Sequence, residues 1–120
     1  HRLPIKIFIL NNEYMGMVRQ WQELLHGGRY SNSYSEALPD FVKLAEAYGA
    51  TGIRAEKPSE LDDAIKRMVE TDGPVIFDCI VTKEENCFPM IPSGAAHNDM
   101  LLADDQGLEV EVSDEGKALV

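Results

Sequence analysis

The sequence has few basic residues, few cysteines and no long apolar run. Its 120 residues include 11 Lys and Arg against 21 Asp and Glu, which gives a formal net charge of −10. Because a nucleic-acid backbone rewards neutralisation by Lys and Arg, this balance argues against nucleic-acid binding. No stretch approaches the ~20 apolar residues that a membrane span needs, and no signal-peptide pattern precedes the first apolar segment. We therefore expect no nucleic-acid partner and no membrane association.

The two cysteines, Cys79 and Cys87, are too few for a disulfide framework, and neither has a His or Cys at metal-ligand spacing. Cys79 lies inside an apolar segment and is expected to be a small core residue. Free thiols suit a reducing compartment, and the simplest such location is the cytoplasm. The chain starts at His1 rather than at a methionine, so we expect it to be a piece of a longer polypeptide.

Apolar segments of two kinds alternate along the chain, short β-branched runs and amphipathic stretches with a 3.6-residue period. This alternation predicts an α/β fold with a parallel sheet covered by helices. A helix follows the first strand, and Pro39 and Ser59 mark the starts of the next two, Pro39 in a first turn and Ser59 as a cap. The expected strands are 5–10, 51–55 and 75–81.

The rest of the chain is organised around the stretch from Ile5 to Val18. Five of the six residues from Ile5 to Leu10 are apolar, which predicts a strand buried on both faces of the sheet. Asn11 and Asn12 follow at once, and a helical apolar pattern begins within about four residues. In open α/β sheets, ligands bind where a strand passes into a helix in this way.

The turn offers oxygen ligands and a phosphate site. An Asn side-chain oxygen and a free main-chain carbonyl are hard, neutral ligands of the kind that Mg²⁺ takes together with phosphate oxygens. The start of the helix supplies N–H groups and a positive dipole end for the same anion. Gly16, which has no Cβ, lets a bulky ligand approach the backbone. The alternative is that Asn11 and Asn12 form only a turn that tolerates unusual backbone angles.

A longer pattern extends this interpretation. Asn11-Asn12 after an apolar strand resembles the closing half of the thiamine diphosphate motif, which opens with Gly-Asp-Gly and ends in Asn-Asn. The segment 11–22 more narrowly resembles the large catalytic subunit of acetohydroxyacid synthases, also called acetolactate synthases. Further matching segments are Tyr30-Ser31, 39–45, Gly73-Pro74-Val75 and 89–95.

The resemblance implies that residues 1–97 are the C-terminal part of a thiamine diphosphate-binding domain, a partial three-layer α/β/α sheet. Residues 98–120 carry seven acids against one lysine and are expected to be an acidic C-terminal tail. The implied activity joins pyruvate to a second 2-ketoacid, giving acetolactate or acetohydroxybutyrate in the biosynthesis of isoleucine, valine and leucine. The implied cofactors are thiamine diphosphate and Mg²⁺, while the FAD of the family is bound mainly outside this segment.

The implied metal ligands are the Asn12 side-chain oxygen and the Tyr14 main-chain carbonyl. The residues placed against the cofactor are Asn12, Tyr14, Met15, Gly16, Met17 and Val18. The family's aspartate ligand and its activating glutamate match no residue here. We therefore assign no catalytic residue to this chain and expect it to be inactive alone. The implied partners are the rest of the catalytic subunit, further copies in a homo-oligomer, and a regulatory small subunit.

Two side chains, Trp21 and Asp78, allow two interpretations each. Trp21 is either a core anchor or, as the resemblance implies, a wall of the substrate pocket together with Met17. Asp78 stands among apolar residues and is either functional or an acid paired with a neighbour on the sheet. His26, at the end of the first helix, is assigned to solvent because it has no visible catalytic partner.

Two alternatives to the synthase remain. One is a non-catalytic α/β interaction module that docks to partner chains. The other is a fragment of a different thiamine diphosphate-dependent 2-ketoacid enzyme.

Overall fold

The computed structural model describes residues 3–103, which fall into two compact units. Among the described residues, the first unit comprises 3–13 together with Ser35–Lys83, and the second comprises Tyr14–Tyr34 together with 84–103. Most of the acidic tail predicted for residues 98–120 lies outside the described residues. Within residues 3–103, no helix has the length and apolar character needed to cross a membrane.

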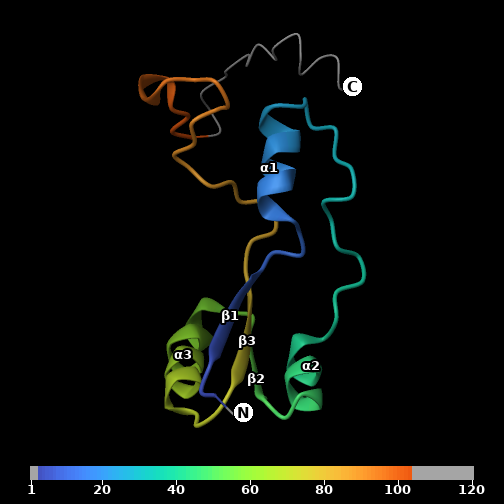
Figure 1. Cartoon of the computed structure of the whole chain (residues 1–120), viewed down its shortest axis with the longest axis vertical. Helices are drawn as coiled ribbons and strands as arrows, with labels where there is room; N and C mark the ends of the chain where they lie inside the picture. Colours follow the sequence, from blue (N-terminus) through green and yellow to red (C-terminus); the bar gives the residue numbers. More distant parts are fainter. Residues whose placement is uncertain (1–2, 104–120) are drawn as a thin grey trace. The chain divides into compact units, whose positions relative to one another are not determined.

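A parallel three-stranded sheet forms the centre of the first unit. Its strands are β1 (Lys6–Asn11), β2 (Thr51–Ala55) and β3 (Val75–Ile80), in the order β1-β3-β2. The central strand pairs on both sides, so that Val75 lies beside Lys6 of β1 and Thr51 of β2. The predicted α/β fold with a parallel sheet is confirmed (Figure 1).

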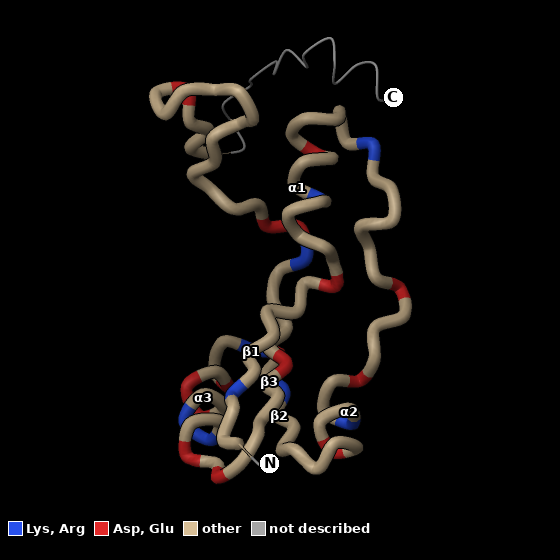
Figure 2. Tube along the Cα trace, viewed as in Figure 1, with Lys and Arg blue, Asp and Glu red and all other residues tan. Residues whose placement is uncertain are grey.

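Helices α2 (Phe41–Ala47) and α3 (Leu61–Glu70) cover opposite faces of this sheet (Figure 1). α2 lies so close to β2 that a Cβ built on Gly52 would be 2.8 Å from the Cα of Val42. Acidic and basic residues run along both helices (Figure 2), and the charged residues of α3 are exposed. Each helix therefore turns an apolar face to the sheet and a charged face outward, as expected for amphipathic helices.

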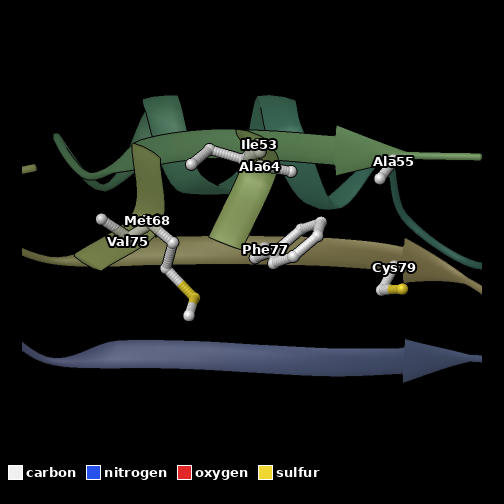
Figure 3. Packing of buried hydrophobic residues seen from close by; sticks show 7 residues of the cluster. All are labelled: Ile53, Ala55, Ala64, Met68, Val75, Phe77 and Cys79. Atoms are coloured by element: carbon white, nitrogen blue, oxygen red, sulfur yellow. The ribbon is translucent and has the colours of Figure 1, made fainter. Parts of the chain in front are cut away.

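The hydrophobic core of the first unit lies between the sheet and α3. Alternate residues of β2 and β3 point to this face, where they meet two residues of α3 (Figure 3). Leu61 and Ile65 of α3 are partly buried and pack against the cluster. The cluster consists of Ile53, Ala55, Ala64, Met68, Val75, Phe77 and Cys79.

The first strand differs from its prediction, which was burial on both faces. β1 pairs only with β3 and is an edge strand of the described sheet. Leu10 is 68% exposed and Phe8 is 39% exposed, although the centroid of the Phe8 ring lies 4.5 Å from the centroid of the Phe77 ring. A continuous apolar run indicates that a strand is suited to burial, but not which neighbours cover it in a given chain.

Two helix starts also differ from the predictions. α2 begins after Pro39, with Asp40 as the N-cap, whose carboxylate accepts hydrogen bonds from the N–H groups of Val42 and Lys43. α3 follows a 3₁₀ turn, η1 (Pro58–Glu60), and Ser59 does not cap it. The Glu60 carboxylate instead accepts the N–H groups of Glu56 and Lys57, because Pro58 starts the 3₁₀ turn earlier in the chain.

The second unit is built around helix α1 (Gly16–Leu24). Two isolated antiparallel bridges add to it, one between Tyr14 and Tyr34 and one between Met90 and Leu101. A short 3₁₀ turn, η2 (His97–Asp99), precedes Leu101, which is buried.

Candidate functional site

The predicted ligand-binding turn is held at several points in the first unit. The Asn11 side-chain oxygen accepts a hydrogen bond from the Glu13 N–H at 3.1 Å, and Glu13 has a positive φ of 61°. The Glu13 carbonyl accepts from the N–H of Ser35 at 2.8 Å, and its carboxylate pairs with Lys83 at 2.5 Å. A left-handed conformation costs a non-glycine residue roughly 1–2 kcal/mol. These contacts offset that cost and fix the path of the chain around Asn12.

A buried carboxylate lies behind this turn on the α2 face of the sheet. Asp78 of the central strand is fully buried, and its Oδ1 accepts from the Asn11 amide at 2.9 Å. Its Oδ2 accepts from Arg54 of β2, with Nε at 3.0 Å and an Nη at 2.9 Å. Both oxygens therefore have donors from flanking strands. Of the two interpretations of Asp78, the structure shows the acid paired with neighbours on the sheet.

Arg54 links this carboxylate to the start of α2. Its guanidinium lies 3.2 Å from a carboxylate oxygen of Asp40, the N-cap of that helix. The hydrogen bond to Asp78 is the largest influence that raises the pKa of Arg54, and the charges of Asp78 and Asp40 add to it. The pKa of Asp40 is lowered, first by the N–H of Lys43 and then by the charge of Arg54. The four side chains Asn11, Asp78, Arg54 and Asp40 thus form one polar network across the sheet.

In the second unit, the beginning of α1 has no side-chain cap. Met15 occupies the N-cap position without a side-chain hydrogen bond, while its own N–H donates to the carbonyl of Ser33 at 2.8 Å. First-turn N–H groups of a helix have no partner within the helix itself. The start of α1, which follows Tyr14, can therefore offer N–H groups and a positive dipole end to an anion.

One side of α1 buries polar residues that hold two loops. The Arg19 guanidinium lies over the rings of Tyr14 and Tyr30, at 5.4 and 5.1 Å from their centroids, and pairs with Glu23 at 2.5 Å. These contacts attach the segment around Tyr30 to the helix. Desolvation is the largest influence on the pKa of Arg19 and lowers it, but the pKa is raised on balance because Glu23 and other negative groups outweigh the burial.

Gln20, the next residue, holds the second loop. Its side-chain oxygen accepts from the N–H of Cys87 at 2.6 Å, and its amide donates to the carbonyl of Cys87 at 3.1 Å and to the sulfur of Met90 at 2.9 Å. Gln20 is almost fully buried. It therefore satisfies both main-chain polar groups of one loop residue.

The other side of α1 exposes apolar residues around a hollow of about 340 Å³. Trp21 is 44% exposed, and Met17 and Val18 are similarly accessible. Gln22 and His26 complete the lining, and the buried side-chain oxygen of Gln22 has no hydrogen-bond partner among the described residues. This helix thus reverses the usual pattern, since it buries Arg19 and Gln20 and exposes its large apolar side chains.

The structure brings together some of the predicted site residues. Met17, Val18 and Trp21 share one hollow in the second unit, and Gly16 is the first residue of α1. Asn12 belongs to the held turn of the first unit. Within residues 3–103, no group of three or more His, Cys, Asp or Glu side chains can hold a metal ion. A metal bound here would need main-chain or amide oxygens and ligands from elsewhere.

Several residues around the site were missed by sequence reasoning. Asn11 was treated as part of the turn, whereas its side chain holds that turn in place. Lys83 and Arg54 carried no signal, because their partners are distant in the sequence. His26 was assigned to solvent but lines the hollow beside Trp21.

Comparisons with known proteins agree on one family. Residues 1–79 match the family described as "Thiamine pyrophosphate enzyme, C-terminal TPP binding domain". The chain is 47% identical over 102 residues to the acetolactate synthase large subunit of Cyanidium caldarium, which covers 84% of this chain and 17% of that protein. It is 42% identical over 110 residues to acetolactate synthase 1, chloroplastic, of Zea mays, covering 86% of this chain and 17% of that protein.

A solved structure gives the same assignment at the level of fold. The thiamine diphosphate-dependent 4-hydroxybenzoylformate decarboxylase of Rhodococcus jostii RHA1 matches with a TM-score of 0.61 and 28% identity, covering 72% of this chain and 16% of that one. The chain therefore spans less than a fifth of the length of these relatives.

Proposed function

Because the chain belongs to the thiamine pyrophosphate enzymes, whose C-terminal TPP binding domain it matches over residues 1–79, we propose that it forms part of the large catalytic subunit of an acetolactate synthase. The observation that carries this proposal is the 47% identity over 102 residues to a protein of that name. The reaction would join pyruvate to a second 2-ketoacid, for the synthesis of branched-chain amino acids. The cofactors would be thiamine diphosphate and Mg²⁺.

In this proposal, the stretch from Asn12 to Val18 binds the cofactor. Asn12 supplies a side-chain oxygen and Tyr14 a main-chain carbonyl to Mg²⁺. Met15, Gly16, Met17 and Val18 lie against the cofactor. The fit is supported by the fixed turn at Glu13 and by the missing side-chain cap of α1, whose N–H groups suit a diphosphate.

The bound cofactor would supply the carbanion chemistry, and the protein would position it and exclude water. Met17 and Trp21 would form the pocket for the second 2-ketoacid, since their side chains are exposed and line the same hollow. No residue of this chain is proposed to transfer a proton. The activating acid and a further metal ligand would come from the rest of the catalytic subunit, so the isolated chain should be inactive.

The remaining partners and the compartment are also proposals. We expect the chain to act within a homo-oligomer of catalytic subunits that binds FAD through other parts of the polypeptide and accepts a regulatory small subunit. The two cysteines are free, which is compatible with a reducing compartment such as the cytoplasm.

The test uses a chimera in which this sequence replaces the segment that it matches in the large subunit of Cyanidium caldarium. The chimera should form acetolactate from pyruvate in a reaction that depends on thiamine diphosphate and Mg²⁺, and the isolated chain should not. Release of acetaldehyde without acetolactate would instead favour a decarboxylase, the activity that the likeness to the Rhodococcus enzyme supports. A folded chimera that binds no cofactor would favour the non-catalytic module.

Two substitutions in the chimera test the ligand assignment. Asn12→Ala should weaken Mg²⁺-dependent cofactor binding strongly because it removes a ligand oxygen. Tyr14→Phe should have almost no effect, since a main-chain ligand does not depend on the hydroxyl and the ring that contacts Tyr34 and Arg19 is retained. Equal losses for the two variants would show that this division of roles is wrong.

A further inference from the structure

The orientation of the Asn11 side chain is decided by a residue that the proposed function does not use. An Asn amide can present either its oxygen or its nitrogen in a given direction. Here the oxygen faces the Glu13 N–H at 3.1 Å, and the nitrogen faces a carboxylate oxygen of Asp78 at 2.9 Å. Because an ionised carboxylate only accepts hydrogen bonds, Asp78 requires the nitrogen of Asn11 on its side. The oxygen is thereby directed to Glu13.

This orientation matters because the following residue is held in an unfavourable conformation. Glu13 has a φ of 61°, and the bond from its N–H to Asn11 is the local contact that an Asx turn uses to stabilise such a bend. If the Asn11 amide turned over, its NH₂ group would face the Glu13 N–H and the hydrogen bond would be lost. The path of the chain through Asn12 would then be less well fixed.

Asp78 is itself fixed by its place in the sheet. It lies beside Ile9 of β1 and Arg54 of β2 in the strand register, and it is fully buried. The guanidinium of Arg54 occupies its second oxygen at 2.9–3.0 Å, so the first oxygen remains for Asn11. All of these groups belong to the first unit.

We propose that Asp78 is a positioning residue for the metal site: its buried carboxylate acts through the Asn11 amide to hold the turn that carries Asn12. This inference rests on the proposed function, because it assumes that Asn12 binds Mg²⁺. Groups behind metal ligands typically change metal affinity by about 10–100-fold when they are altered. Asp78 acts one residue further from the metal, so we expect a change near the lower end of that range.

The test exchanges donor and acceptor between the two positions in the chimera. Asn11→Asp places two carboxylates against each other. Asp78→Asn leaves one acceptor oxygen at position 78 for two donors, Arg54 and the Asn11 amide. Since Arg54 is charged, it keeps that oxygen. The new NH₂ group then faces Asn11, and the Asn11 amide must turn over to present its oxygen. The double variant Asn11→Asp/Asp78→Asn restores every contact. The carboxylate at position 11 accepts from the Glu13 N–H and from the amide nitrogen at position 78, and the amide oxygen at position 78 still accepts from Arg54.

Two measurements follow the effect. In the metal-free protein, hydrogen exchange at the Glu13 amide should rise in each single variant and return to the parent rate in the double variant. In the presence of thiamine diphosphate, the Mg²⁺ affinity should fall about tenfold in each single variant and recover to within about threefold of the parent in the double variant.

A control separates positioning from plain stabilisation. Arg54→Lys weakens the paired contact to Asp78 but leaves the Asn11 contact, so it should lower the melting temperature and leave the Mg²⁺ affinity unchanged. The inference is overturned if the single variants lower only the melting temperature, or if the double variant fails to restore exchange and affinity. A folded parent chimera that binds no Mg²⁺ with thiamine diphosphate contradicts the proposed function, while the exchange data still decide whether Asp78 orders the turn.

Discussion

Replacement of Trp21 by leucine distinguishes a pocket wall from a core anchor. Trp21 is 44% exposed and lines a hollow of about 340 Å³ with Met17, Val18 and two further residues. A Trp side chain that is fully buried removes up to about 250 Å² from water, so just over half of that area is buried here. If leucine retains half of the buried area, the buried area lost is on the order of 70 Å². At 25 cal/mol/Å², the free energy of unfolding then falls by less than about 2 kcal/mol.

This figure differs from the cost of truncating a core tryptophan, which is about 3–5 kcal/mol. We therefore expect Trp21→Leu in the chimera to lower the melting temperature less than truncation of a core aromatic residue would. Its effect should appear in the choice of the second substrate. Pyruvate and 2-ketobutyrate differ by one methylene, and an apolar pocket discriminates such a pair by about 1–3 kcal/mol at most. Loss of the wall should reduce the preference for 2-ketobutyrate within that limit.

The assay offers both 2-ketoacids in competition and measures the ratio of acetohydroxybutyrate to acetolactate beside the melting temperature. Phe77→Leu is the matched control, because Phe77 is fully buried in the core of the first unit. It should lower the melting temperature and leave the product ratio intact. If Trp21→Leu behaves like Phe77→Leu, the reasoning is refuted and Trp21 is a core residue.

Three further predictions concern stability and are measured as changes in the melting temperature of the chimera. Gly52→Ala should destabilise the protein by about 1–3 kcal/mol, because the new Cβ would lie 2.8 Å from main-chain atoms of Val42. Gln20→Leu should cost about 2–4 kcal/mol, since it leaves the N–H and the carbonyl of Cys87 without their partners. Asp40→Asn should make stability less dependent on pH on the acid side, because the pKa of Asp40 is lowered in the folded state. The ionised Asp40 carboxylate therefore stabilises the fold above the ordinary carboxyl pKa of about 4, and this stabilisation is lost as the pH falls through the lowered pKa.

Each of these has a control in the same chain. Val42→Ala should restore only part of the stability lost in Gly52→Ala. Of the three Val42 atoms that lie 2.8 Å from the new Cβ, this change removes the one beyond Val42 Cβ and leaves the two main-chain atoms. Gln22→Leu makes the same change at a neighbouring position of α1, where the amide makes one exposed hydrogen bond to the carbonyl of Ser31, and it should cost less than Gln20→Leu. Glu46→Gln is the control for Asp40→Asn, because it removes a carboxylate of α2 that accepts no N–H group of the first turn. The pH dependence of stability on the acid side should stay as in the parent. The opposite order within any pair would contradict the contact concerned.

The fold was largely predictable because its signals are local. The strand predicted at 75–81 is an apolar run that follows Pro74, and the shorter one at 51–55 follows the helix that stops at Gly49. The structure has β2 at Thr51–Ala55 and β3 at Val75–Ile80. Burial of the first strand was not predictable, since it depends on what pairs with the free edge of β1. The start of α3 was not predictable from Ser59, because the 3₁₀ turn Pro58–Glu60 precedes the helix and its N-cap residue, Glu60, makes no side-chain hydrogen bond to it.

The polar network of the first unit could not be predicted for a different reason. Asp78, Arg54 and Asn11 are separated by at least 24 residues in each pairing, and they meet only because the register places Arg54 directly beside Asp78. A one-residue slip of either strand would move its side chain to the other face of the sheet. Sequence patterns set the period of a strand but leave its register open, so a buried acid is recognisable while its partners are not.

The reversed pattern of α1 offers a physical reason to place the ligand on this helix. A helix that serves only stability buries its apolar face and exposes its polar one. α1 instead buries Arg19 and Gln20, and it leaves Met17, Val18 and Trp21 at least 44% exposed. Burying polar groups is tolerable because each is hydrogen-bonded to a loop or to a neighbouring side chain. Exposing three large apolar side chains brings no such compensation within the described residues. Departures of this kind from the usual pattern are expected at functional sites, where a ligand restores the missing contacts. The same helix thus uses its polar side to hold its loops and keeps its apolar side for the proposed cofactor and substrate.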